Sequence, residues 1–172
     1  FGGLNLLGVI HLHESDFSAA ADTLARAVEI NAQSDATFNN LALALKSLSR
    51  RSEAIVAIDK AIGLSPRTPD FWNLRGLIHS EMMELDRAAR DFDRAIELNP
   101  KFAVAFYNKG NALRRLGLLD EAIQCIETSL ALDPNYTNAL TVMGTLHQAK
   151  GNLQSAESYF NRALSLKPNA AD

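Results

Sequence analysis

The chain of 172 residues has little of what several functional classes need. It contains one cysteine, Cys125, which excludes an internal disulfide framework and a zinc site built from several cysteines. No run approaches 18 uncharged apolar residues, so no segment is predicted to cross a bilayer. Its 17 basic and 20 acidic residues give a net charge of −3, which provides no basic surface for nucleic acid or anionic lipid. We therefore predict a folded chain with no nucleic-acid partner and no membrane insertion.

The sequence also lacks the short motifs of the common enzyme chemistries. It contains no phosphate-binding loop, dinucleotide-binding glycine motif, nucleophile elbow or HExxH zinc motif. His11, His79 and His147 recur at the same position of alternate repeats, too far apart to share one metal through bonds of about 2.1 Å. Cys125 is typical of a packing thiol. The expectation is a chain with no catalytic residues, no metal site and no cofactor, and not an enzyme.

What the sequence does contain is a period of 34 residues. Pro66, Pro100, Pro134 and Pro168 are equally spaced, and one further step back falls on Ala32. This register divides the chain into five repeats, which are residues 1–34, 35–68, 69–102, 103–136 and 137–170. Such self-similarity is the sequence signature of an array of identical supersecondary units.

Small and large side chains alternate at fixed positions of each repeat. Position 8 is Gly or Ala, as in Gly110, and position 20 is Ala throughout. Positions 4 and 24 are large and apolar, as in Ile126. The spacing predicts two amphipathic helices per repeat, over positions 2–14 and 18–30, which approach closely at the small residues. Gly117 and Gly151 are placed as glycines that end the first helix, and short polar residues such as Ser18 are placed to cap the second.

A single helix pair cannot bury its apolar face alone, but stacked pairs can. The sequence therefore predicts an all-α fold in which residues 1–172 form one solenoid domain of five antiparallel helix pairs.

The pattern resembles the tetratricopeptide repeat in its period and in its small-large alternation. The third repeat carries the best match, in Trp72, Gly76, Ala88, Phe92, Ala95 and Pro100. The departures are Arg75 and Lys109 at position 7, usually Leu, and Arg51 at position 17, usually apolar. The resemblance implies a right-handed α-solenoid, a superhelix whose first helices line a concave groove that holds a peptide or a partner helix.

The resemblance also implies which residues face that groove, and several are Asn. An Asn carboxamide can bond both the C=O and the N–H of an extended peptide, whatever its side chains. Asn also occurs on helix surfaces without a ligand, and adjacent Arg residues are also typical of a solvated face. The predicted peptide-binding residues are Asn5, Asn39, Asn40, Leu43, Asn73, Leu77, Tyr107, Asn108, Asn111, Arg114 and Arg115.

These observations favour a protein-interaction scaffold that binds a protein or peptide ligand, in the cytoplasm. The chain starts at Phe1 and shows no capping helix after the fifth repeat, so we expect a fragment of a longer protein. Two alternatives stay open at this point. One is the substrate-recognition arm of a larger enzyme similar to O-linked N-acetylglucosamine transferase. The other is a scaffold that self-assembles into a homo-oligomer through uncapped solenoid ends.

Overall fold

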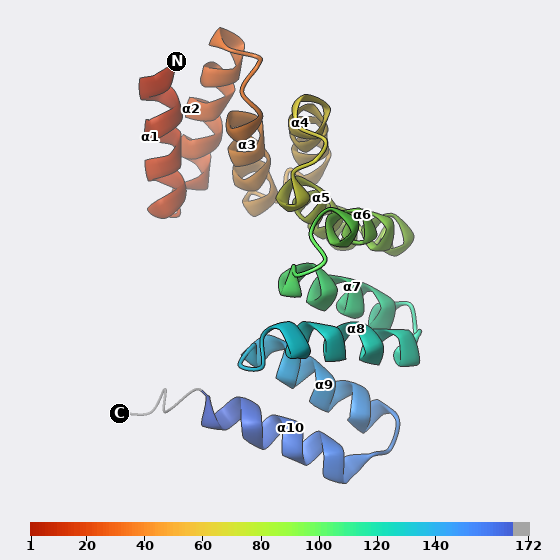
Figure 1. The fold of residues 1–172 in the computed structure, drawn as a ribbon. Helices are drawn as coiled ribbons and strands as arrows, with labels where there is room; N and C mark the ends of the chain where they lie inside the picture. The colour runs from red at the N-terminus through yellow and green to blue at the C-terminus, as the bar shows by residue number, and fades with distance from the viewer. Residues whose placement is uncertain (167–172) are drawn as a thin grey trace, which may run out of the picture. The chain divides into compact units, whose positions relative to one another are not determined.

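The computed structural model describes residues 1–166, which form ten α-helices and no strand (Figure 1). Pro168 and the predicted end of the fifth repeat lie outside these described residues. The chain divides into two compact units, Phe1–Glu84 and Leu85 onward. The first unit contains α1 (Gly2–His13), α2 (Phe17–Ile30), α3 (Asp35–Ser47), α4 (Arg51–Leu64) and α5 (Pro69–Glu81). The second contains α6 (Leu85–Leu98), α7 (Ala103–Arg115), α8 (Leu119–Leu132), α9 (Thr137–Ala149) and α10 (Leu153–Ser165).

The helices fall within one or two residues of their predicted positions. First helices end at position 13 and second helices begin at position 17 of each repeat. Because the second helices begin one residue early, Ser18 lies inside α2 rather than at its cap. The cap is Asp16, whose side chain accepts a hydrogen bond from the Ala19 N–H at 3.0 Å. The predicted all-α class is confirmed, and the helices of each unit stack in chain order as in a solenoid.

First and second helices play different parts in this stacking. Successive first helices touch each other, as α1 does α3, α3 does α5 and α7 does α9. Successive second helices, α2 with α4 in the first unit and α8 with α10 in the second, make no such contact among the described residues. Within each unit, therefore, the first helices lie on the tighter, inner side of the stack and the second helices on the wider, outer side.

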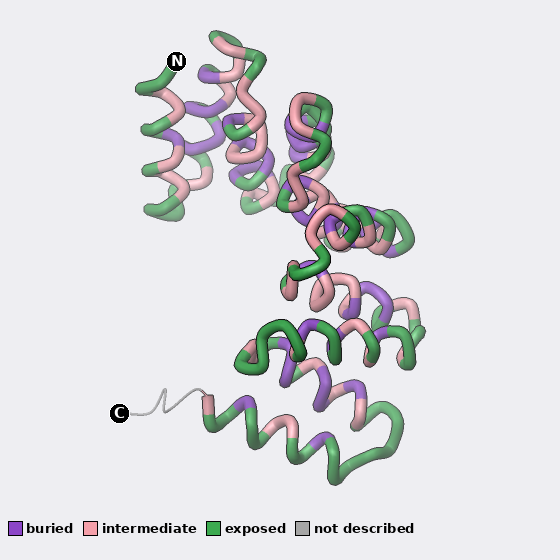
Figure 2. Tube along the Cα trace, viewed as in Figure 1, coloured by how far each residue is buried: buried purple, intermediate pink, exposed green. Residues whose placement is uncertain are grey.

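The predicted contact between positions 8 and 24 is present. A methyl group built on Gly8 would lie 2.5 Å from Leu24, one on Gly110 2.7 Å from Ile126, and one on Gly144 2.5 Å from Phe160. Those distances are shorter than any real carbon contact, so glycine is what lets the two helices of these repeats pack together. Buried residues follow this contact along the facing sides of the helices (Figure 2).

The turn between the two helices of a repeat places position 15 in the left-handed region. Gly117 and Gly151 occupy it in the last two repeats, with φ of 81° and 79°. Ser15, Ser49 and Met83 occupy it in the first three, with φ of 61°, 62° and 64°. A side chain raises the energy of this conformation by about 1–2 kcal/mol, so the earlier turns are strained.

Charged residues at position 7 are explained by position 25 of the preceding repeat. The Arg75 guanidinium lies 2.7 Å from the Asp59 carboxylate and 4.6 Å from the ring centroid of Trp72. The Lys109 ammonium lies 2.6 Å from the Asp93 carboxylate. Each pair joins the first helix of one repeat to the second helix of the repeat before it.

The basic residue at position 17 of the second repeat also joins two repeats. The Arg51 guanidinium of α4 lies 3.3 Å from the Glu81 carboxylate at the end of α5. The same carboxylate lies 2.8 Å from the Lys46 ammonium of α3. The departures from the repeat pattern are thus ion pairs between repeats rather than disruptions of the packing.

Candidate functional site

The predicted groove residues of the first unit centre on α3. Asn39 and Asn40 are half-buried, and their side chains make no hydrogen bond within residues 1–166. Leu43, one turn further along, is 39% exposed. On the neighbouring α1, Asn5 is also half-buried, but its Oδ1 already accepts a hydrogen bond from the Thr37 hydroxyl at 3.0 Å. The structure thus leaves Asn39 and Asn40 with unused donors and acceptors at the inner side of the unit.

The two predicted residues on α5 are less accessible. Asn73 is 9% exposed and has an interaction partner, so its carboxamide contributes to packing. Leu77 is half-buried. Both follow the first-helix pattern of the repeat, but both are less exposed than Leu43 of α3.

The predicted residues of the second unit all lie on α7. The ring of Tyr107 contacts that of Tyr136 with centroids 4.9 Å apart and planes 52° apart. Burial, with smaller effects from Tyr107 and Asp133, raises the pKa of Tyr136 to about 12, so this phenol stays neutral at ordinary pH. The Asn111 carboxamide donates to the Tyr107 carbonyl at 3.3 Å, within its own helix.

The other three differ in exposure. Asn108 is half-buried and has a partner, whereas Arg114 and Arg115 are exposed at the last turn of α7. Arginines in that place also interact favourably with the C-terminal end of the helix dipole. The α7 face therefore combines an aromatic pair with two cations.

His11, His79, His147 and Cys125, which the sequence predicts to be packing residues, are each partly buried. The Nδ1 atom of His79 lies 2.7 Å from the Glu84 carboxylate, and the ring of His147 stacks on Tyr159 with centroids 5.4 Å apart. Burial raises the pKa of Cys125, although the nearby Lys109 ammonium opposes this, so the thiolate needed for nucleophilic chemistry is disfavoured. Over the described part of the chain, no three His, Cys, Asp or Glu side chains gather as metal ligands would.

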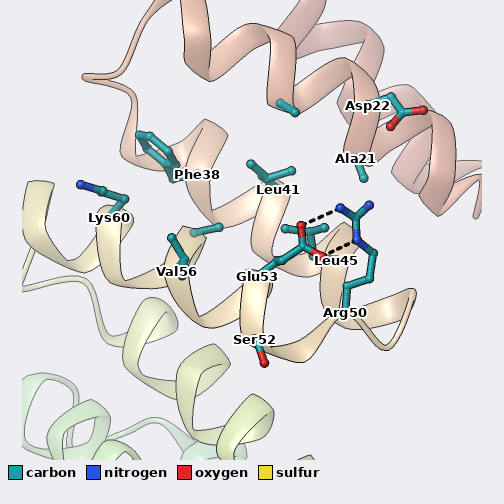
Figure 3. Close-up of a pocket in the computed structure, with 12 residues that line it drawn as sticks. Ala21, Asp22, Phe38, Leu41, Leu45, Arg50, Ser52, Glu53, Val56 and Lys60 are labelled. Carbon is teal, nitrogen blue, oxygen red and sulfur yellow. Dashed lines mark hydrogen bonds and ion pairs between the residues drawn. The ribbon is translucent and has the colours of Figure 1, made fainter.

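A pocket of about 480 Å³ lies on the outer side of the first unit, between α2 and α4 and over α3 (Figure 3). Its lining is mainly apolar, and Val56 of α4 stands on its rim with 62% of its surface exposed. At one end, Arg50 donates to the Glu53 carboxylate through Nε at 2.8 Å and through a terminal nitrogen at 2.7 Å. The apolar residues of the lining are Ala21, Ala25, Phe38, Leu41, Leu45, Val56 and Ala57.

A second pocket of about 460 Å³ adjoins the first and shares Phe38 and Lys60 with it. It extends the groove to the C-terminal end of α4, where it is lined by Gly63 and by Ala32 in the turn before α3. We call the two pockets together the α2–α4 groove. The predicted site residues all lie on first helices, so the sequence-based prediction does not include this groove. The signal is in Ala57, where every other repeat carries a larger residue, and in Ala21, where the second, fourth and fifth repeats do.

Within residues 1–166, no helix is both long enough and apolar enough to span a bilayer.

Comparison with family profiles identifies the tetratricopeptide repeat over three consecutive stretches, residues 36–68, 69–102 and 101–169. Together these stretches cover most of the chain. A comparison with curated proteins found no match.

Solved structures share the fold at low sequence identity. "MamA 41-end from Desulfovibrio magneticus RS-1" superposes with a TM-score of 0.85 at 17% identity, covering 98% of this chain and 96% of that one. "Crystal structure of MamA" superposes with a TM-score of 0.81 at 23% identity, covering 92% and 93%. "Crystal structure of YrrB: a TPR protein with an unusual peptide-binding site" gives a TM-score of 0.73 at 19% identity, covering 97% and 86%.

Proposed function

Because the chain belongs to the tetratricopeptide-repeat family, we propose that it is a protein-interaction module whose first helices hold an extended peptide or a partner helix. The observation that carries the proposal is the inner side of the first unit. There, α3 touches both α1 and α5, and Asn39 and Asn40 keep unused hydrogen-bonding groups. Binding at this face requires no catalytic group.

The two carboxamides are held on a rigid support. Leu41, Ala42 and Leu45 fix the opposite side of α3 in the core, with exposures of 8%, 0% and 5%. A carboxamide on such a helix loses little freedom when it binds, which lowers the entropic cost of recognition. Asn39 and Asn40 would each donate to a peptide carbonyl or accept from a peptide N–H, while Leu43 contacts an apolar side chain of the ligand.

The α7 face of the second unit would contribute different chemistry. Tyr107 offers an aromatic surface, held in place by its contact with Tyr136. The side chain of Arg114, which makes no hydrogen bond or ion pair among residues 1–166, would bind a carboxylate of the ligand. This face therefore favours an acidic or aromatic segment, whereas the α3 face favours the peptide backbone itself.

The similarity to YrrB supports a peptide as the ligand class, since that structure is described as having a peptide-binding site. The organisation of residues 1–172 as one domain within a longer protein, and the cytoplasmic location, stay predictions. So do the two alternatives of an enzyme's substrate-recognition arm and of end-to-end self-assembly.

The proposal can be tested with random 12-residue peptides displayed on phage. Peptides selected on the wild-type chain are synthesised with a fluorophore, and their dissociation constants are measured by fluorescence anisotropy. The double substitution Asn39→Ala plus Asn40→Ala should weaken binding about tenfold, since each lost hydrogen bond is worth about 0.5–1.5 kcal/mol.

The control is Gln124→Ala, a change of similar size on the exposed side of α8. It should leave the affinity unchanged. Selected peptides that bind the double variant as tightly as the wild type would contradict the assignment of the α3 face, as would a selection that enriches no peptide.

A further inference from the structure

The α2–α4 groove differs from the place between α8 and α10, one of two equivalent places in the second unit; the other, between α6 and α8, carries Ala89 and Cys125. Between α8 and α10, the positions of Ala21 and Ala57 are taken by Ile123 and Tyr159. Both large side chains pack against the buried cluster of that unit, and the Tyr159 ring lies nearly parallel to the His147 ring, at 11°. The repeat geometry thus leaves room for an aromatic ring between neighbouring second helices. Between α8 and α10 the chain supplies that ring itself, and between α2 and α4 it supplies two methyl groups.

The charged residue beside the ring differs in the same way. Arg162 of α10 donates a hydrogen bond to the carbonyl of Pro134, which precedes the fifth repeat. Lys60 stands at the equivalent position of α4, and within residues 1–166 its side chain makes no hydrogen bond or ion pair. At the other end of the groove, Arg50 is already neutralised by Glu53 (Figure 3). Of the carboxylates in the lining, Glu53 pairs with Arg50, Asp59 pairs with Arg75 of α5, and Asp22 lies at the Arg50 end. Lys60 is therefore the lining cation without a partner among the described residues.

We propose that the α2–α4 groove binds a peptide segment of a partner protein that inserts an aromatic side chain beside an acidic residue. The aromatic ring would lie over Ala21, Ala25 and Ala57, where the second unit carries its own large side chains. The carboxylate next to it would pair with Lys60. Val56, exposed on the rim, would cover the ring from the α4 side.

The length of the groove favours a peptide over a small molecule. Its lining follows α4 from Arg50 to Leu64, which is about 20 Å at 1.5 Å per helical residue. An extended peptide of about six residues covers that distance at roughly 3.3 Å per residue. Phe38 and Lys60, shared by the two pockets, lie where the middle of such a segment would pass.

The groove is separate from the face assigned to α3 above. Phe38, Leu41 and Leu45 line the groove and recur at the spacing of one helix side. Asn39, Asn40 and Leu43 project from the opposite side of the same helix by the same spacing. One unit therefore carries two faces, and a ligand on one leaves the other accessible.

The test selects phage-displayed random 12-residue peptides on the chain carrying Asn39→Ala and Asn40→Ala, so that the α3 face does not dominate. Selected peptides should contain Phe, Tyr or Trp next to Asp or Glu. Titration of a selected peptide into alanine-methyl-labelled protein should shift the NMR signals of Ala21, Ala25 and Ala57. The substitution Ala57→Tyr, which copies the second unit, should weaken binding at least 50-fold, and Lys60→Ala about fivefold.

The matched control is Arg162→Ala, the same change at the equivalent position of the fifth repeat, which should leave the affinity unchanged. Should Ala57→Tyr fail to fold, judged by circular dichroism, Val56→Asp on the exposed rim serves instead and should weaken binding about tenfold. Enriched peptides without an aromatic residue, shifts confined to other alanines, or equal binding by the rim variant would overturn the proposal. So would N-acetyltyrosinamide binding as tightly as the peptides, or self-association of the free chain through this groove.

Discussion

The two compact units are built from the same repeat, but they carry different residues at the turn position with positive φ and between the second helices. At position 15, where the turn requires positive φ, the second unit has Gly117 and Gly151, while the first unit has Ser15, Ser49 and Met83. Between α8 and α10, the second unit fills the available space with Tyr159, whereas between α2 and α4 the first unit has Ala57. The helices begin and end at nearly the same repeat positions in both units, so these differences lie in the side chains.

This contrast indicates that the repeat geometry does not depend on an ideal residue at each position. Stacking over many contacts holds the turn of Met83 in a conformation that a side chain disfavours by about 1–2 kcal/mol. Proteins commonly keep such suboptimal positions because selection acts only on a stability threshold, or because function uses them. In the first unit, the unfilled space also creates the pocket that a ligand can enter.

The largest expected effect tests how tightly the second unit is packed. In Gly144→Ala, the added methyl group meets the Phe160 ring at 2.5 Å, whereas Ala42 at the equivalent position of the first unit already carries one. Overpacking costs about 1–3 kcal/mol and outweighs the helix-propensity gain of about 1 kcal/mol. We expect the free energy of unfolding, measured by urea denaturation, to fall by about 1–2 kcal/mol.

Gly63→Ala is the control for that substitution, because it adds the same group to α4 of the first unit with nothing within 4 Å. It should raise the free energy of unfolding by about 0.5–1 kcal/mol through helix propensity alone. A stabilising effect of both substitutions would show that the α9–α10 contact is looser than the structure indicates.

The next effect exchanges the turn residues of the two units. Met83→Gly should stabilise the chain by about 1 kcal/mol, because glycine adopts the φ of 64° without the side-chain penalty. Gly117→Ser should destabilise it by a similar amount, since its φ of 81° would then carry a side chain. Thermal denaturation followed by circular dichroism measures both. Equal and small effects at the two positions would mean that the turn strain is relieved by the surrounding contacts.

The smallest effect separates the two ion pairs by pH. Although burial disfavours its charge, the hydrogen bond to Asp93 and the attraction of that carboxylate raise the pKa of Lys109. A raised pKa means that the pair stabilises the fold fully below the ordinary lysine value of about 10.4 and ceases to do so as pH rises through the raised value. Arg75, paired with Asp59, keeps its charge throughout this range.

Asp93→Asn and Asp59→Asn should therefore each lower the free energy of unfolding by about 0.5–1 kcal/mol at pH 8. The cost of Asp93→Asn should disappear at strongly alkaline pH, while that of Asp59→Asn should persist. Urea denaturation of both variants and the wild type at a series of pH values measures the difference. A cost of Asp93→Asn that does not change with pH would exclude the ion pair as its origin.

The regular part of the fold was predictable because it is set by a period. Thirty-four-residue spacing of prolines and the small residues at positions 8 and 20 place the helices and their contact, as Gly110 against Ile126 confirms. Individual residues could not be predicted where two repeats cooperate. Considered by itself, Arg75 departs from the repeat pattern. It is explained by its ion pair with Asp59, which stands at position 25 of the preceding repeat.

The candidate sites were predictable only in part. The side of α3 that carries Asn39 and Asn40 follows from helical spacing. The hydrogen bond that Asn5 accepts from Thr37 could not be predicted, because Thr37 belongs to the next repeat. The α2–α4 groove exists because small side chains leave space between the two helices. Small apolar residues carry no binding chemistry of their own, so their type alone does not indicate a site. Comparison of Ala57 with Tyr159 at the same repeat position would have shown it.

The separation of successive second helices also has a mechanical consequence. Because α1 and α3 touch while α2 and α4 do not, bending of the first unit should change the outer spacing more easily than the inner spacing. A ring inserted between α2 and α4 would then fix the distance between these helices and, with it, the curvature of the stack. Occupancy of the outer side would in this way set the width available to a peptide on the inner side.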